Sequence, residues 1–196
     1  MKVAIVKYNA GNVRSVIFAL HRLGVEPVWT DDADELRSAD KVIFPGVGEA
    51  SSAMEYLRVR RLDRLITELR QPVLGICMGL QLMCAHSEEH DTECLGIVPY
   101  HVRRFETDLK VPHVGWNAIG DLRGPLFEGI SDGAYAYFVH SYFAPTGKKD
   151  CARTEYSLRF ASAFQDRNYY AVQFHPEKSG DVGQQILANF LRLQTI

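Results

Sequence analysis

A cysteine lies between two glycines in the segment 75–81, which has the sequence G-I-C-M-G-L-Q. The short apolar run 71–74 before it is typical of a buried strand, and the residues after it are good helix formers. Cys77 is therefore expected where a strand becomes a helix. Glycines two residues before and two residues after it allow a tight turn without Cβ clashes. A thiol at the start of a helix faces unpaired N–H groups and the positive end of the helix dipole, which favours the thiolate.

The pattern around Cys77 matches the nucleophile elbow G-x-S-x-G, with the sulfur of cysteine in place of the oxygen of serine. We therefore interpret Cys77 as a nucleophile. The alternative is a small buried cysteine without a chemical role, which is common for isolated cysteines. The two glycines at symmetric offsets favour the nucleophile.

A cysteine nucleophile needs a base and a group that orients the base, and His175 with Glu177 offers both. The apolar and aromatic run 169–174 predicts a strand, so His175 would lie at a strand end, where function is often placed in α/β sheets. Pro176 biases His175 toward extended geometry. Glu177 can then reach the same side of the chain and fix the imidazole tautomer. Seen alone, such a pair is more often a strand-end histidine and a solvated glutamate.

A glycine turn follows a third predicted strand, at Pro45, Gly46, Val47 and Gly48. Glycines there free backbone N–H groups to point at a ligand, as an oxyanion hole requires. A turn without chemistry is an equally good interpretation of this segment alone. As a dinucleotide-binding fingerprint it is poor, because the third glycine is missing and the turn does not follow the first strand.

These three elements, in this order, resemble the class I (triad-type) glutamine amidotransferases. The family pattern combines an oxyanion glycine turn, a G-x-C-x-G-x-Q elbow and a late H-P-E, and the resemblance covers nearly the whole chain. Segments 9–16, 111–117, 137–142 and 175–179 resemble one branch of the family, the glutaminase subunits of imidazole glycerol phosphate synthases. The chain departs from the family at Lys7, Asn9 and Val114, none of which belongs to the triad.

The resemblance implies hydrolysis of L-glutamine to glutamate, with ammonia passed to a separate (β/α)8-barrel cyclase subunit in a heterodimer. That cyclase makes imidazole glycerol phosphate and AICAR from a phosphoribulosyl-formimino nucleotide in histidine biosynthesis. No cofactor and no metal are implied. A paralogous subunit that feeds ammonia to another synthase, such as a surface-sugar amidinating enzyme, stays open as an alternative.

The resemblance also implies roles for individual residues. The catalytic triad would be Cys77, His175 and Glu177. The oxyanion would meet backbone N–H groups of the segment formed by Gly46, Val47 and Gly48, and of Met78. The substrate would be held by Gly79, Gln81, Glu89, Ser141 and Tyr142. The face toward the cyclase would include Asn12, Trp116, Tyr137 and Lys178. Trp116 and Tyr137 are the kind of aromatic residues that dominate interfaces, although a core role is the usual one for each.

Composition agrees with a globular enzyme. We expect 1–196 to be a single glutamine amidotransferase type-1 domain, since 196 residues with 46% hydrophobic content can bury a substantial core. The net charge of −2 gives no reason to expect nucleic acid or an anionic membrane as partner. No apolar run approaches the roughly 18 residues of a membrane span. The N-terminal apolar stretch lacks a signal-peptide pattern, and cysteines without a C-x-x-C pair fit the cytoplasm.

Periodicity predicts an α/β fold. Strands are expected at 2–8, 25–30, 41–46 and 71–74, and helices at 12–23, 34–38, 50–57 and 62–69. This alternation predicts a mainly parallel sheet with helices on both faces. From residue 95 onward the expectation changes to extended segments at 95–105, 134–144 and 152–156, then a final helix at 182–193. We therefore expect an antiparallel extension of the sheet in the second half.

Three other functions fit the sequence less well. The segment 86–90, H-S-E-E-H, matches the inverted zinc-protease motif, but it continues into what looks like a polar turn and lacks an evident third ligand. A different thiol enzyme on a similar sheet, such as a protease or chaperone, is disfavoured by Gln81 and the late H-P-E. A silent scaffold that only binds a partner is disfavoured by the complete set of Cys, His and Glu.

Overall fold

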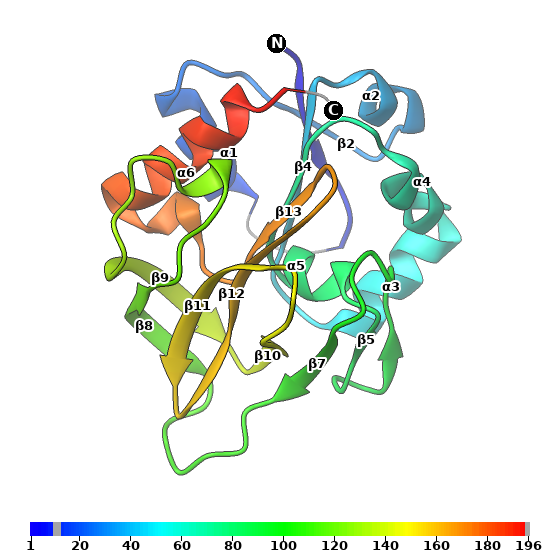
Figure 1. The fold of residues 1–196 in the computed structure, drawn as a ribbon. Helices are drawn as coiled ribbons and strands as arrows, with labels where there is room; N and C mark the ends of the chain where they lie inside the picture. Colours follow the sequence, from blue (N-terminus) through cyan, green and yellow to red (C-terminus); the bar gives the residue numbers. More distant parts are fainter. Residues whose placement is uncertain (10–12, 195–196) are drawn as a thin grey trace.

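The computed structural model describes residues 1–9 and 13–194 and has an eleven-stranded mixed sheet at its centre (Figure 1). The parallel part runs, in spatial order, through β2 (Val28–Thr30), β1 (Val3–Val6), β3 (Lys41–Gly46), β4 (Val73–Cys77) and β13 (Tyr169–Val172). The strand nearest the C-terminus thus pairs with β4 from the first half, which brings the ends of β4 and β13 together.

The antiparallel extension begins at β12, which pairs with β13. It continues through β12 (Leu158–Asp166), β10 (Tyr142–Pro145), β7 (His101–Arg104), β5 (His86–Ser87) and β6 (Thr92–Glu93), with β11 (Asp150–Tyr156) also paired to β12. Within this part, β5 and β7 run parallel. A separate two-stranded antiparallel sheet is formed by β8 (His113–Ile119) and β9 (Ala134–His140).

Helices cover both faces of the sheet (Figure 1). One face carries α2 (Ala33–Ser38), α3 (Ala50–Val59), α4 (Leu62–Glu68) and α5 (Met78–Met83). The other face carries α1 (Arg14–Arg22) and α6 (Gly180–Arg192), together with the β8–β9 sheet and the 3₁₀ turn η1 (Pro125–Phe127). A second 3₁₀ turn, η2 (Pro176–Lys178), leads from β13 toward α6.

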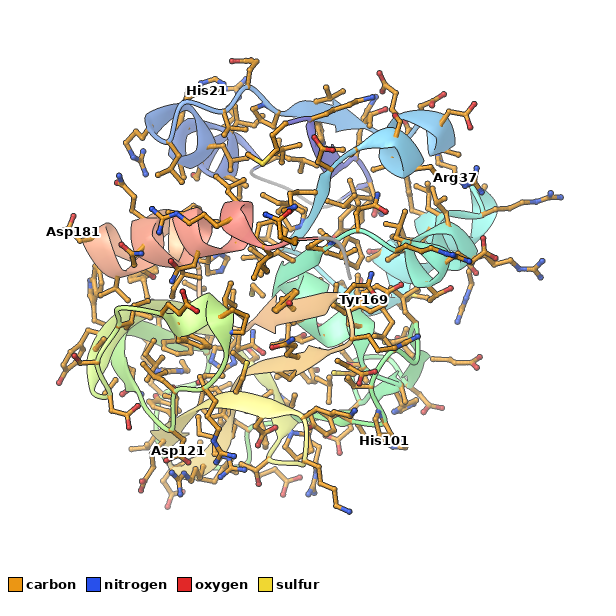
Figure 2. All side chains as sticks on the ribbon, turned by 45° about the horizontal axis from the view of Figure 1, so that its top comes forward. His21, Arg37, His101, Asp121, Tyr169 and Asp181 are labelled. Atoms are coloured by element: carbon orange, nitrogen blue, oxygen red, sulfur yellow. The ribbon has the colours of Figure 1, made fainter. Side chains whose placement is uncertain are left out.

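Two hydrophobic cores follow from the alternation of side chains along the central strands. On β1, Ala4 points into the core under α2 to α5, whereas Ile5 points into the core under α1 and α6. Tyr169 lies inside the molecule, while Asp181 on α6 extends from its surface (Figure 2). The Tyr169 hydroxyl donates to the Ile66 carbonyl at 2.9 Å, which ties α4 to β13.

The expected fold is confirmed: the sheet is mainly parallel in the first half, flanked by helices, and antiparallel in the second. The predicted elements of the first half are present with shifts of a few residues at their ends. Among residues 1–9 and 13–194, no helix is both long and apolar enough to cross a bilayer.

Some predicted segments were wrong. Residues 95–100 are not a strand, because the N–H groups of Leu95, Gly96 and Ile97 donate to carbonyls at the end of α5 instead of to a sheet neighbour. The expected segment 134–144 is broken at Ser141 into β9 and β10, which join different sheets. Sequence reasoning also missed β8 and β12, whose polar and small residues weaken the apolar pattern.

Helix α5 lies against β3 at Gly79. A Cβ atom at this position would overlap the carbonyl oxygen of Phe44, a backbone atom that cannot move aside. Gly120 is a matched glycine with open space, since its Cβ would meet no atom within 4 Å.

We predict that Gly79→Ala lowers the free energy of unfolding by about 3 kcal/mol, the upper end of overpacking costs. Gly120→Ala should change it by no more than about 0.5 kcal/mol. Urea denaturation of both variants measures the difference. Equal stability of the two variants would show that α5 has room to move away from β3.

Candidate active site

Cys77 is the last residue of β4 and the residue from which α5 begins. Its backbone has φ 53° and ψ −103°, which is rare for a residue with a side chain. The strand behind it is held on both sides, because β4 pairs with β3 and β13 and Cys77 itself pairs with Gly46. The side chain is 6% exposed. The expected strand-to-helix turn is therefore present, and the cysteine itself takes the unusual conformation.

The glycines around Cys77 are required by space. A Cβ at Gly75 would meet backbone atoms of Gly79 and Leu80 at 3.0 Å or less, and one at Gly79 would overlap β3. Neither glycine has a positive φ. The elbow thus depends on close packing of its two glycines, while its strain is concentrated at Cys77.

His175 follows β13, and its ring is oriented by Glu177. His175 Nδ1 lies 2.8 Å from Glu177 Oε1, and both side chains are 4% exposed. Because a carboxylate accepts, Nδ1 carries the proton and Nε2 is left for another partner. The backbone is also fixed: the His175 N–H donates to the Tyr137 carbonyl at 2.8 Å.

A buried serine holds the segment that carries His175. Ser179 Oγ donates to the His175 carbonyl at 2.6 Å and accepts the Tyr137 N–H at 2.9 Å. Ser179 is 1% exposed, so this link between η2 and β9 is shielded from water. Sequence reasoning placed no role on Ser179.

The groups around His175 offset the effect of burial on its pKa. Burial lowers its pKa, but the negative charge and hydrogen bonding of Cys77, followed by those of Glu177, outweigh this and raise the pKa to about 10. The imidazole therefore keeps its proton at neutral pH beside Cys77 and Glu177. Such an arrangement can supply a nucleophile and an acid in one desolvated place.

One cavity of about 310 Å³ unites most of the predicted residues, a size at the lower end of ligand pockets. Its wall includes Val47, Gly48, Cys77, Met78, Gln81, Glu89, Ser141, Tyr142, His175 and Lys178. Gly79 and Gly46 are not part of this wall. Gly79 packs against β3, and Gly46 lines a neighbouring hollow beside Tyr8 and Glu177.

The glycine turn is anchored by a tyrosine that sequence reasoning missed. The Tyr8 hydroxyl donates to the Pro45 carbonyl at 2.6 Å, and a Cβ at Gly46 would overlap that hydroxyl. Gly48 has φ +118°, a conformation that side chains disfavour. The turn therefore needs glycine at both positions, for space at Gly46 and for conformation at Gly48.

Two of the expected substrate residues also make bonds within the protein. Glu89 Oε2 accepts the Ala50 N–H at 2.7 Å and so caps α3. Burial raises the pKa of Glu89, while the bond from Ala50 opposes this. Gln81 Nε2 donates to the Tyr142 carbonyl at 2.9 Å and to Gln173 Oε1 at 3.1 Å.

The residues expected at the partner face differ in exposure and position. Trp116 on β8 is 54% exposed and makes an edge-to-face contact with Tyr137, its register partner on β9. Lys178 is exposed at the mouth of the cavity. Asn12 lies outside the described residues.

The histidines of segment 86–90 do not converge on a metal site. His86 pairs with Asp91, whereas His90 faces Glu49. Within 1–9 and 13–194, no three His, Cys, Asp or Glu residues are grouped as metal ligands.

Two further polar residues near Cys77 were missed. Gln173 Nε2 lies 3.6 Å from Cys77 Sγ, and His140 forms part of the cavity wall. Gln173 is two residues before His175 at the end of the predicted strand 169–174, so the sequence allows both side chains to face one side. That spacing is the signal that could have found it.

Comparison with known proteins agrees with the geometry. The family model "Glutamine amidotransferase class-I" matches residues 5–193. The chain belongs to the class I glutamine amidotransferase family. It is 55% identical to imidazole glycerol phosphate synthase subunit HisH of Bacteroides fragilis, covering 98% of this chain and 100% of that protein. The HisH subunit of Idiomarina loihiensis is 44% identical, with 98% of each chain covered.

Solved structures show the same fold. A glutamine amidotransferase crystal structure has a TM-score of 0.76 with 19% identity, covering 96% of each chain. Another, from Thermotoga maritima, has a TM-score of 0.64 with 14% identity and covers 97% of this chain and 82% of that one. The expected family and fold are thus confirmed.

We predict that Glu177→Gln lowers the pKa of His175 from about 10, because it removes a negative charge that favours the imidazolium. The sign extends to stability: a raised histidine pKa stabilises the fold below pH 6.5, and this contribution is lost as pH rises through about 10. NMR titration of the His175 ring in both proteins measures the shift. An unchanged or higher pKa in the variant would contradict the pairing.

Proposed function

We propose that this chain is the glutaminase subunit of an imidazole glycerol phosphate synthase. It hydrolyses L-glutamine and passes ammonia to a (β/α)8-barrel cyclase subunit in a heterodimer. The observation that carries the proposal is the meeting of Cys77 with the His175–Glu177 pair at one cavity. The full-length similarity to HisH subunits supports the histidine branch over a subunit that serves another synthase.

In the first half of the reaction, the Cys77 thiolate attacks the side-chain amide carbon of glutamine and forms a carbon–sulfur bond. The electron pair of the C=O bond moves to oxygen. When it returns, the carbon–nitrogen bond breaks, and His175 gives its proton to the leaving nitrogen, which departs as ammonia. A glutamyl thioester remains on Cys77.

In the second half, water attacks the thioester and His175 takes a proton from that water. Collapse of the tetrahedral intermediate breaks the carbon–sulfur bond, releases glutamate and restores the thiolate. Glu177 remains a carboxylate throughout and stabilises the imidazolium. Burial of the pair strengthens this interaction, because little water competes for it.

Backbone N–H groups would receive the oxyanion formed in each half. We assign this role to the turn at Gly46, Val47 and Gly48 and to Met78 at the start of α5. Gly79 makes room for α5 beside the substrate site. The amino acid end of glutamine would be held by residues of the cavity wall, namely Gln81, Glu89, Ser141 and Tyr142.

The proposal includes the setting of the enzyme. Residues 1–196 would form one domain, supported by a sheet to which both halves of the chain contribute strands. A cytoplasmic location is supported by four buried free cysteines. The cyclase would meet the face that carries Trp116, Tyr137 and Lys178, which is supported by the exposed Trp116 ring and by the place of Lys178 in the cavity wall.

We predict that Cys77→Ser abolishes glutaminase activity while the fold persists, because the two side chains are nearly isosteric. A glutamine-like electrophile should label Cys77 in the wild-type protein and spare Cys84, Cys94 and Cys151. Mass spectrometry of the digested protein identifies the site. Labelling of another cysteine with Cys77 untouched would refute the nucleophile.

We also predict that glutamate release is slow in the isolated chain, faster with the cyclase, and fastest when the cyclase binds its nucleotide. Withdrawal of one oxyanion donor costs about 10²–10³ in rate, so rotation of a peptide in the glycine turn suffices for a large activation. Lys178→Ala should alter the coupled rate more than glutamine binding. Equal rates in all three conditions would exclude such a switch.

A further inference from the structure

The side-chain amide of Gln173 is buried against the sulfur of Cys77. This residue has no exposed surface, and its backbone N–H donates to the Ser162 carbonyl of β12 at 2.8 Å. Its Nε2 lies 3.6 Å from the sulfur of Cys77. A buried amide in contact with a nucleophile is costly unless both of its ends are satisfied.

The orientation of this amide follows from a backbone carbonyl. The Tyr142 oxygen can only accept, so the Gln81 group that faces it at 2.9 Å is the NH₂ group. The same NH₂ group lies 3.1 Å from the Gln173 amide, which must present its oxygen there. The NH₂ group of Gln173 is therefore directed at Cys77.

The Tyr142 carbonyl is itself held in place by a pair of buried histidines. His140 Nδ1 donates to it at 2.8 Å, which leaves His140 Nε2 to accept from His113 Nδ1 at 3.0 Å. Burial lowers the pKa of His140 to about 3 and that of His113 to about 4. Both rings are therefore neutral, and this network brings no charge toward the sulfur.

Besides His175, the sulfur of Cys77 faces two different partners. The Val139 carbonyl, 3.7 Å away, can only accept and thus suits a thiol. The Gln173 N–H groups donate and thus suit a thiolate, and hydrogen bonding to a charged form favours that form. The donor is rigid because Gln81 fixes its other end.

We propose that Gln173 is a positioning residue that favours the Cys77 thiolate and fixes its place through a side-chain N–H donated to Sγ. This inference rests on the proposed role of Cys77 as nucleophile. Gln173 lies two residues before the H-P-E motif. The proposal gives it a function in the reaction that is separate from substrate binding.

The test replaces the donor and measures the thiolate directly. Gln173→Met keeps the length of the side chain and removes its N–H groups. The rate of Cys77 alkylation by iodoacetamide at pH 7 should fall about tenfold, the low end of what a hydrogen bond to a charged group contributes. With the cyclase present, kcat for glutamate release should fall similarly while KM for glutamine changes less than twofold.

Gln71→Met is the matched control. Gln71 is also buried, its Nε2 donates to the Leu36 carbonyl at 2.7 Å, and it lies just before the opposite end of β4. This variant should lose stability in urea denaturation but alkylate at the wild-type rate. If Gln173→Met does not fold, Gln173→Glu at pH 8 keeps the acceptor for Gln81 and replaces the donor, with the same expected slowing.

Alkylation within twofold of wild type in the Gln173 variant would overturn the inference, as would equal slowing in the Gln71 control. A failure of the proposed function looks different. In that case glutamine does not protect Cys77 from labelling, either in the wild-type protein or in the Gln173 variant. The inference about Gln173 is then refuted together with the proposed function.

Discussion

The strained backbone of Cys77 is the constraint on which the site depends. A residue with a side chain at φ 53° and ψ −103° costs about 1–3 kcal/mol, and it persists only when its surroundings leave no alternative. Here β4 is paired on both sides, so Cys77 cannot relax along the sheet. Gly75 and Gly79 allow α5 to begin directly against β3. The sulfur is thereby presented at the sheet edge where β13 also ends.

The second element of the site is a buried set of charges that stabilise one another. His175 and Glu177 are almost fully removed from water. Burial by itself favours the neutral form of an ionisable side chain. Cys77 and Glu177 reverse this for the imidazole, so that the pKa of His175 is raised although burial lowers it. Hydrogen bonds between neutral groups hold His175 in place. Ser179 joins η2 to β9, and the Tyr137 carbonyl accepts from the His175 backbone N–H.

Sequence reasoning found what local patterns encode. The glycine spacing around Cys77 and the strand before His175 are contiguous signals, and both were located correctly. Glu89 was placed at the cavity, but its bond to Ala50 joins residues far apart in the chain and has no local signal. The same holds for Tyr8, which follows β1 and whose hydroxyl reaches Pro45 on the neighbouring strand β3. It also holds for β12, whose small residues are buried only because β11 and β13 flank them.

Strand β9 connects the cavity with the outer face of the molecule. The carbonyl of Tyr137 holds His175, and that of Val139 contacts the sulfur of Cys77. The Tyr137 side chain meets exposed Trp116 on β8. Main-chain groups of one strand therefore hold the backbone of His175 and contact the sulfur of Cys77, while Tyr137 on the same strand packs against the exposed Trp116.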